Sequence, residues 1–156
     1  MSIKNLKPTP NSKYESGYYS PKYPDKYRGD LKKIIYRSSY ERRMCQFCDL
    51  TDSVIEWSSE PIAIMYTSMY DNRRHKYWVD FWVKLNNGKE FIVEVKPSMK
   101  LKKPRKTKRN IKSFNEAAKE YLVNYSKFQA ASQFAKASGM EFIIADENFL
   151  FSIKSK

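Results

Sequence analysis

The stretch YWVDFWVKLNNGKEFIVEVK, residues 77–96, includes three residues that could do chemistry together, Asp80, Glu94 and Lys96. Asp80, Glu94 and Lys96 are surrounded there by Val, Ile, Trp and Phe, residue types that favour β-strands. Carboxylates placed opposite each other in a sheet repel, and a divalent cation such as Mg²⁺ (or Mn²⁺) relieves that repulsion because it takes carboxylates as ligands. A lysine on the same face can position a water molecule or stabilise negative charge on a phosphate group. Together these residue types predict a metal-dependent site for phosphodiester hydrolysis.

The register of the predicted hairpin decides whether the three groups meet. The tripeptide NNG predicts a three-residue loop in which Gly88 adopts the left-handed conformation. Asp80 then lies directly opposite Glu94, and Trp78 lies opposite Lys96. Because side chains alternate between the faces of a strand, one face is wholly apolar and is predicted to face the core: Tyr77, Val79, Phe81, Val83, Leu85, Phe91, Val93 and Val95. The opposite face carries Trp78, Asp80, Trp82, Ile92, Glu94 and Lys96.

A plain solvated face, with Lys96 neutralising one of the two acids, is the alternative to a metal site. Large apolar neighbours argue against it, because Trp78, Trp82 and Ile92 are not residues that a solvated face prefers. We therefore expect the face that carries Asp80 to be a functional site.

The elements around the hairpin predict an α/β fold. Ser38 and Glu41 match the S-x-x-E capping box at the start of a helix over SSYERRMCQFCDL. Two short strands, VIEW and PIAIMY, and a polar link, TSMYDNRRHK, precede the hairpin, and a long helix from about Phe114 to Ser138 follows it, ended by Gly139. EFIIA is one further strand, and NFLFSI is a short final element. The order of helix, three to four strands, helix and strand predicts a mixed β-sheet flanked by helices.

Residues 1–30 differ in composition from the remainder of the chain. They are rich in Pro, Tyr, Lys and Ser without a sustained period, so we expect an extended N-terminal arm. Residues 31–156 are expected to form a single domain with its own core. No apolar run approaches the roughly 18–20 residues of a membrane span, and the N-terminal residues have no apolar signal segment. We therefore expect a cytosolic protein without a membrane partner.

The chain has a large excess of positive charge, with 30 Lys and Arg against 17 Asp and Glu. Such an excess predicts a polyanionic partner, with nucleic acid ahead of an anionic membrane. Positive charge is concentrated in residues 96–112, the basic segment, which contains no acid, and in NRRHK before the hairpin. The residues predicted to contact DNA are Arg73, Arg74, Lys100, Lys102, Lys103, Arg105, Lys106, Lys108, Arg109 and Lys112. A solvated loop is the alternative for the basic segment. Because no recognition helix is evident, we expect binding of double-stranded DNA that is mostly independent of sequence.

The two cysteines and the one histidine do not predict a metal centre of their own. A zinc site needs about four ligands, and His75 cannot complete one with Cys45 and Cys48. We expect the cysteines to be ordinary half-buried thiols of the first helix, with redox chemistry as the alternative. His75 is expected to contact a phosphate or to lie at the surface.

The acidic pair and the lysine also match a known motif. VDFWV followed by EFIVEVK resembles the D-(x)n-E-x-K signature of the PD-(D/E)xK nucleases, and the order of elements resembles their restriction-endonuclease-like core. The commonest form of the motif has proline before the aspartate, where this chain has Val79. Over about residues 36–147, YRSSYERRMCQFCD, WSSEPIAIMY, HKYWVDFWV and NYSKFQAASQFAKASGMEFIIADE are similar to the head completion nucleases of T-even-type tailed phages. They are more distantly similar to the TnsA-type transposition endonucleases.

The resemblance implies roles for individual residues. Asp80 and Glu94 correspond to the metal-binding pair, and Lys96 corresponds to the catalytic lysine. Glu41 corresponds to the acid of the first helix and completes the implied catalytic and metal-binding set, although a capping box alone also explains a glutamate there. Glu60, in SSEP, is the alternative acid.

The resemblance also implies a function. An endonuclease of this kind would process DNA ends during head completion of a tailed phage, after packaging and before tail joining. It would act in the host cytoplasm, or remain as a minor virion component near head and neck proteins. A non-enzymatic DNA-end-binding or head-plugging protein is one alternative, and a TnsA-type transposition endonuclease is another. Lys127 and Gln129, on the long helix, are predicted as auxiliary polar residues near the same site.

Overall fold

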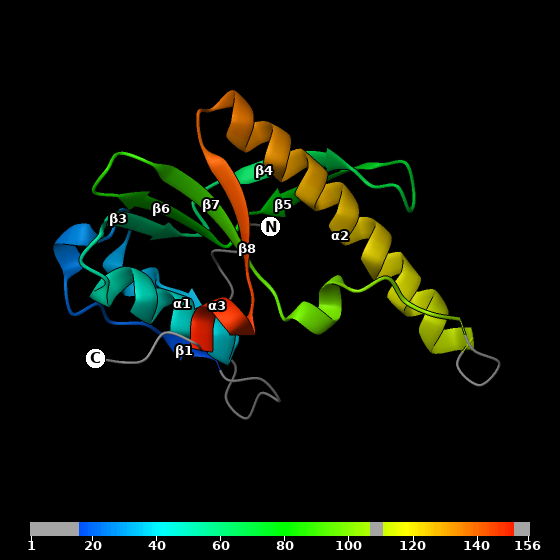
Figure 1. Ribbon diagram of the computed structural model, residues 1–156, viewed down its shortest axis with the longest axis horizontal. Helices are drawn as coiled ribbons and strands as arrows, with labels where there is room; N and C mark the ends of the chain where they lie inside the picture. Colours follow the sequence, from blue (N-terminus) through cyan, green and yellow to red (C-terminus); the bar gives the residue numbers. More distant parts are fainter. Residues whose placement is uncertain (1–15, 107–110, 152–156) are drawn as a thin grey trace.

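A four-stranded sheet lies at the centre of the computed structural model, which describes residues 16–106 and 111–151 (Figure 1). The strand order is β3 (Val54–Ser59), β6 (Phe81–Leu85), β7 (Glu90–Val95) and β8 (Glu141–Ala145). β8 pairs parallel with β7, and the other neighbours pair antiparallel. A parallel pair needs a long crossover connection, and α2 (Ile111–Ala137) lies on that connection. The predicted α/β fold with a mixed sheet flanked by helices is confirmed.

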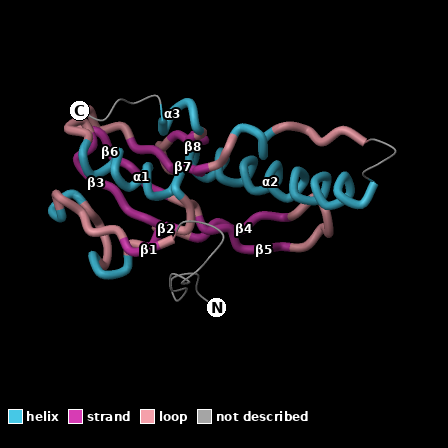
Figure 2. The backbone as a smooth tube through the Cα atoms, turned by 90° about the horizontal axis from the view of Figure 1, so that it is seen from below, coloured by secondary structure: helices cyan, strands magenta, loops and turns pink. Residues whose placement is uncertain are grey.

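Helices and a smaller sheet cover the two faces of the central sheet (Figures 1 and 2). α1 (Ser39–Leu50) and α3 (Glu147–Phe151) pack on one face, over a core that buries Trp57 and Phe81. α2 and the two-stranded sheet of β4 (Ala63–Thr67) and β5 (Arg74–Trp78) enclose a second core, which buries Ile92 of β7 and Ala131 of α2. None of the helices within the described ranges is long and apolar enough to cross a membrane.

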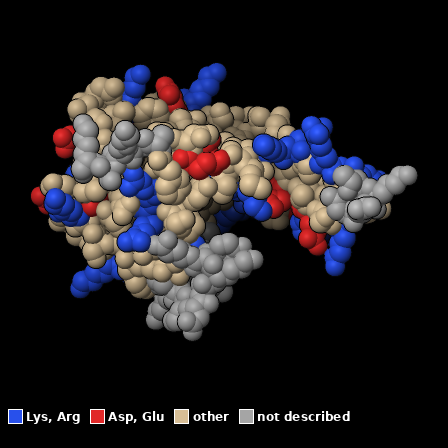
Figure 3. All heavy atoms as spheres, turned by 60° about the horizontal axis from the view of Figure 1, so that its bottom comes forward, with Lys and Arg blue, Asp and Glu red and all other residues tan. Residues whose placement is uncertain are grey.

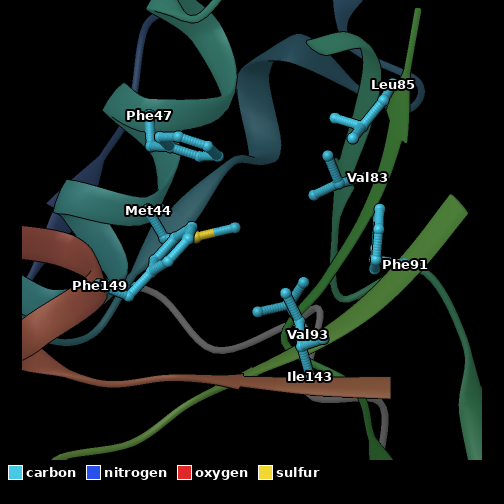
Figure 4. A pocket seen from close by; sticks show the side chains of 8 residues that line it. All are labelled: Met44, Phe47, Val83, Leu85, Phe91, Val93, Ile143 and Phe149. Atoms are coloured by element: carbon cyan, nitrogen blue, oxygen red, sulfur yellow. The ribbon is translucent and has the colours of Figure 1, made fainter. Parts of the chain in front are cut away.

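The core beneath α1 and α3 contains a pocket (Figure 4). Its lining residues come from α1, α3 and three strands: Met44, Phe47, Val83, Leu85, Phe91, Val93, Ile143 and Phe149. Each of these side chains is apolar, so the pocket offers no group that can bind a phosphate or a metal ion. It is a gap in the packing of the core, and the charged residues must be considered on the other face of the sheet.

The predicted first hairpin strand, residues 77–85, is not continuous. β5 ends at Trp78 and pairs with β4, whereas β6 starts at Phe81 and pairs with β3 and β7. Tyr77 and Val79 consequently lie in the core beneath α2, and the prediction that they share a face with Phe81 is wrong. The chain bends between the two strands and changes the face on which its side chains lie.

The bend is caused by the neighbouring segment between β3 and β4. Between β3 and β4, Glu60 adopts a positive φ of 48° and Pro61 has no N–H to donate, so a straight ladder cannot continue there. The Glu60 N–H donates to the Asp80 carbonyl oxygen at 2.8 Å, and the Val79 N–H donates to the Ile62 carbonyl oxygen at 3.2 Å. These two bonds hold the breaks side by side, with Asp80 at the point where the chain passes from one sheet to the other.

The remaining part of the hairpin has the predicted register. Phe81 faces Val93, and Gly88 has a positive φ of 86° in the loop. The predicted pairing of Trp78 with Lys96 is wrong, because Trp78 belongs to β5 and pairs with β4. The loop chemistry thus sets the register only as far as β6 extends.

Residues 16–30, part of the segment expected to be an extended arm, pack on the domain. The elements there and nearby are β1 (Gly17–Tyr18), β2 (Ile35–Tyr36) and 3-10 turns at Pro24–Lys26 and Leu31–Lys33; a further 3-10 turn, Ser98–Leu101, follows β7. The buried Asp49 of α1 accepts hydrogen bonds from the Tyr19 hydroxyl and from the N–H groups of Lys22 and Tyr23, at 2.7–2.9 Å. The part of the predicted arm before residue 16 lies outside the described residues.

Candidate active site

Asp80 and Glu94 form the acidic pair of the candidate site. Asp80 lies at the bend between β5 and β6, where its Oδ2 accepts a hydrogen bond from the Val95 N–H at 2.8 Å. Glu94, on β7, is only 7% exposed. Burial and the negative charges of Glu94 and Glu41 raise the pKa of Asp80 well above its usual range. The two carboxylates are therefore close enough that the ionisation of one opposes that of the other, which favours a bound cation.

Lys96 follows β7 directly and is held between the acidic pair and α2. Its Nζ lies 3.5 Å from Glu94 Oε1 and donates a hydrogen bond to Asn124 Oδ1 at 3.3 Å. The centroid of the Phe128 ring lies 5.8 Å from the same nitrogen. Asn124 and Phe128 are one turn apart on α2, so a single face of this helix presents both to the lysine. Asn124 is not among the residues predicted from the sequence. The feature that could have identified it is that a polar residue stands on the buried face of the long helix.

Two further residues connect the acidic pair to α2. The Tyr77 hydroxyl donates to Glu94 Oε2 at 2.5 Å, and Lys127 Nζ lies 5.5 Å from the centroid of the Tyr77 ring. Burial lowers the pKa of Lys127, and the charges of Glu94 and Asp80 oppose that change. The structure thus brings Lys127 to the acidic pair. It does not bring Gln129 there, because this exposed residue lies about 200° further around the helix.

Glu41 and Glu60 approach the pair from α1 and from the break between β3 and β4. The Glu41 N–H donates to the Ser38 hydroxyl at 3.1 Å, so Ser38 caps α1 in the predicted manner. Burial raises the pKa of Glu41, the charge of Arg37 opposes the rise, and the charge of Glu60 adds to it. Arg37 also forms an ion pair with the Glu60 carboxylate. The charge of Glu41 acts on Asp80, and Glu60 contacts Asp80 through its backbone N–H, so both acids that the sequence offers as additions lie near Asp80. Arg37 is a cation common to the two.

The donor set suits a lightly coordinated metal ion better than a closed cage. Among the side chains that the structure describes, no three His, Cys, Asp or Glu residues lie close enough together to surround one ion. Glu41, Asp80 and Glu94 are therefore not gathered into one cage in this structure. Mg²⁺ takes one or two carboxylates and keeps several waters, so Asp80 and Glu94 alone are a sufficient donor set.

The basic residues predicted to contact DNA lie in two places. Those of the basic segment that the structure describes are all exposed: Lys100, Lys102, Lys103, Arg105, Lys106 and Lys112. Arg73 and Arg74 are exposed at the start of β5, within the stretch predicted as a link. Lys108 and Arg109 lie outside the described residues. Figure 3 shows Lys and Arg side chains gathered along the α2 limb, which is formed by the N-terminal half of α2 and residues 97–106.

The two cysteines and the histidine lie outside the candidate site. Cys45 and Cys48 are free thiols with no exposed surface, so they are fully buried and not half-buried as predicted. Burial raises the pKa of both thiols, and thiols that resist ionisation are poor nucleophiles and poor metal ligands. His75 Nε2 lies 2.8 Å from Asp71 Oδ2 near the start of β5. Neither the thiols nor the imidazole adds a ligand to the acidic pair.

Comparison with known proteins identifies the class that this fold and site define. The sequence model of the TnsA-like endonuclease N-terminal family matches residues 51–147, a range that includes Asp80, Glu94 and Lys96. The chain belongs to this family, and its resemblance to the PD-(D/E)xK nucleases is confirmed. It is also 34% identical, over 145 residues, to the head completion nuclease of Enterobacteria phage T4. That similarity covers 90% of this chain and 97% of the phage T4 protein.

Proposed function

We propose that this protein is a Mg²⁺-dependent DNA endonuclease (Mn²⁺ being a chemical substitute) that acts in the head completion of a tailed phage. The observation that carries the proposal is the acidic pair Asp80 and Glu94, with Lys96 held beside it by Asn124. Membership of the TnsA-like endonuclease family supports the activity. The identity of 34% along almost the whole of a head completion nuclease supports the phage role.

The acidic pair would hold the metal ion. When bound, Mg²⁺ lowers the pKa of a coordinated water and offsets negative charge on the phosphodiester. The ammonium group of Lys96, held by Glu94 and Asn124, stabilises the charge that grows on a phosphate oxygen during attack. Tyr77 orients the Glu94 carboxylate by donating to Oε2, which leaves Oε1 beside Lys96.

The repulsion within the acidic pair supports a catalytic role over a purely structural one. Burial and nearby carboxylates raise the pKa of Asp80, which means that the ionised pair destabilises the folded protein. A protein that only plugged a head or covered a DNA end has no use for such a pair, and an asparagine would accept the Val95 hydrogen bond equally well. A divalent cation turns the same repulsion into affinity for metal.

The substrate in this proposal is double-stranded DNA, bound mostly without regard to sequence. The exposed basic residues of the α2 limb and of β5 suit the phosphate backbone, which gives affinity but little base discrimination. The DNA would be the ends left after packaging and before tail joining, in the host cytoplasm. Head or neck proteins would then be the protein partners, and the enzyme would remain as a minor virion component.

A nicking assay tests the proposal. Purified protein is incubated with supercoiled plasmid and Mg²⁺, beside Asp80→Asn, Glu94→Gln and Lys96→Met, with Glu141→Gln, an exposed residue of β8, as the matched control. We expect metal-dependent nicking that the control retains and that each site variant loses by at least about 100-fold. Nicking that survives in all three variants, or that needs no divalent metal, would contradict the assigned site. Salt-sensitive DNA binding without any nicking would instead support the end-binding alternative.

A TnsA-type transposition endonuclease is the second candidate, favoured by the family match over residues 51–147. Such an enzyme would have the same acidic pair and lysine but would depend on a partner recombinase. Nicking by the purified chain alone favours the phage role, whereas activity that appears only when a recombinase is added favours transposition.

A further inference from the structure

We propose that the turn between β4 and β5 is a base-stacking contact that directs the enzyme to DNA with unpaired bases, such as frayed or overhanging ends. The inference rests on the proposed function, because it takes DNA as the substrate. The turn comprises residues 68–73 and lies beside α2 (Figures 1 and 2). It presents Met69 and Tyr70, which are 56% and 53% exposed, to solvent.

Hydrogen bonds fix the backbone of this turn. The Met69 N–H donates to the Oγ of the buried Ser126 of α2 at 2.9 Å. The buried Ser68 accepts from the Tyr70 N–H through its Oγ at 3.1 Å and from the Asn72 N–H through its carbonyl oxygen at 2.8 Å. Asn72 closes the turn with a positive φ of 56°. Two large side chains are therefore held in solvent by a rigid backbone, an arrangement that is preorganised for a partner.

The charges around the turn indicate that the partner is nucleic acid. Lys119 Nζ of α2 lies 4.8 Å from the centroid of the Tyr70 ring. Arg73 and Arg74, a few residues after Tyr70, are exposed. The acid of the turn, Asp71, lies 2.8 Å from His75 Nε2 through its Oδ2 and accepts the Arg73 N–H at 2.9 Å, so both contacts hold its carboxylate against the turn. A base can stack on an aromatic ring that is flanked by cations, and the cations can bind the phosphates of the same nucleic-acid strand. An apolar protein partner would leave these cations without counter-charges.

The spacing between the turn and the acidic pair suits a DNA end. Lys119 lies over Tyr70 and Lys127 lies over Tyr77, which binds Glu94. The two lysines are about 12 Å apart along the axis of α2, at 1.5 Å per residue. A stacked strand rises about 3.4 Å per nucleotide, so that length corresponds to about three to four nucleotides. The base on Tyr70 would thus lie three to four nucleotides from the phosphate at the acidic pair.

Binding to two matched DNA molecules tests the inference. The full chain is titrated, in EDTA to prevent cleavage, into a blunt duplex and into the same duplex with a four-nucleotide overhang that carries 2-aminopurine. We expect the wild-type protein to bind the overhang about 5- to 100-fold more tightly and to change the 2-aminopurine emission. Tyr70→Ala should lose both effects and Tyr70→Phe should keep both. Tyr23→Ala is the matched control, because Tyr23 is 48% exposed and carries Lys22 and Lys26 over its ring but lies against α1.

Each other outcome has a definite meaning. Equal weakening of blunt and overhang binding by Tyr70→Ala would show a backbone contact only, and would overturn the inference. No change in either affinity would also overturn it, and would make a protein partner the better explanation of the exposed pair. If the wild-type protein nicks DNA with Mg²⁺ but shows no preference for the overhang, the inference fails and the proposed function stands. A protein that binds neither duplex overturns both.

Discussion

Replacing Asn124 by leucine should slow DNA cleavage without lowering the stability of the fold. Asn124 Oδ1 accepts the hydrogen bond of Lys96 at 3.3 Å, and this orientation of the amide follows from chemistry because an ammonium group can only donate. The Nδ2 atom is buried and has no hydrogen-bond partner among the described residues. Asn124 is 6% exposed, so leucine, a side chain of similar shape, occupies the same space.

The two effects of this change have opposite signs. A hydrogen bond to a charged group contributes about 1.5–3 kcal/mol, and the lower part of that range applies because Lys96 keeps its ion pair with Glu94 at 3.5 Å. If that loss falls on the transition state, cleavage slows roughly 10- to 30-fold. For stability, leucine removes a buried unpaired N–H group, which costs about 1–3 kcal/mol in the wild-type protein. The Lys96 side chain, 18% exposed, can still reach water, so the free energy of unfolding should be unchanged or higher.

Single-turnover nicking of supercoiled DNA, with saturating protein and Mg²⁺, measures the first effect, and thermal denaturation measures the second. Gln129→Leu makes the same change of chemistry on the exposed side of α2 and should cleave at the wild-type rate. In a Lys96→Met background, Asn124→Leu should cause no further loss, because the two residues act as one unit. Wild-type cleavage by Asn124→Leu would refute the idea that Asn124 positions the lysine. A further loss in the Lys96→Met background would show that Asn124 acts without Lys96.

Three other changes test the remaining parts of the structure. Asp80→Asn should abolish nicking yet raise the melting temperature, because an acid whose pKa is raised in the folded state costs stability as the pH rises from its ordinary pKa through the raised one. The difference from wild type should grow across that pH window and then level off, and a lower melting temperature would contradict the account. Four exposed cations of the basic segment can be changed to Gln together: Lys102, Lys103, Arg105 and Lys106. The slope of log Kd against log salt concentration should fall by up to about 0.9 for each phosphate contact that is lost. An unchanged slope would show that the segment does not contact DNA. Asp49→Ala leaves three donors of residues 19–23 without their acceptor. It should lower the free energy of unfolding by about 2 kcal/mol in urea denaturation and speed proteolysis near residue 20. An unchanged urea midpoint would show that water replaces the carboxylate.

The acidic pair could be predicted from the sequence because one hairpin positions most of it. The NNG loop sets the register of β6 and β7, and alternation along β7 places Glu94 and Lys96 on the same face. Alternation fails at the bend, since it assumes a straight strand. The positive φ of Glu60 and its hydrogen bond to Asp80 connect residues far apart in the chain, and no local pattern announces them.

Long-range contacts also explain the other residues that sequence reasoning missed. In the sequence, Asn124 is one ordinary polar residue of a helix. It contacts Lys96 only because of the orientation in which α2 packs on the sheet. Composition predicted an extended arm before residue 31, yet residues 19–23 lie against α1 because a single buried carboxylate, Asp49, accepts three of their donors. A polar segment can therefore order itself on a domain without burying much apolar surface, provided that its donors find such an acceptor.

The bend beside Asp80 is the feature on which the candidate site depends. In a straight strand, Tyr77 would share the face of Phe81 in the α1 core and could not donate to Glu94 beneath α2. The bend also directs β5 along α2, so that the β4–β5 turn reaches Lys119 and Ser126 while the other end of β5 reaches the acidic pair. One interruption in a ladder, caused by Glu60 and Pro61, thus places both regions along α2, the β4–β5 turn at Lys119 and the acidic pair at Lys127, two residues about 12 Å apart along the helix axis.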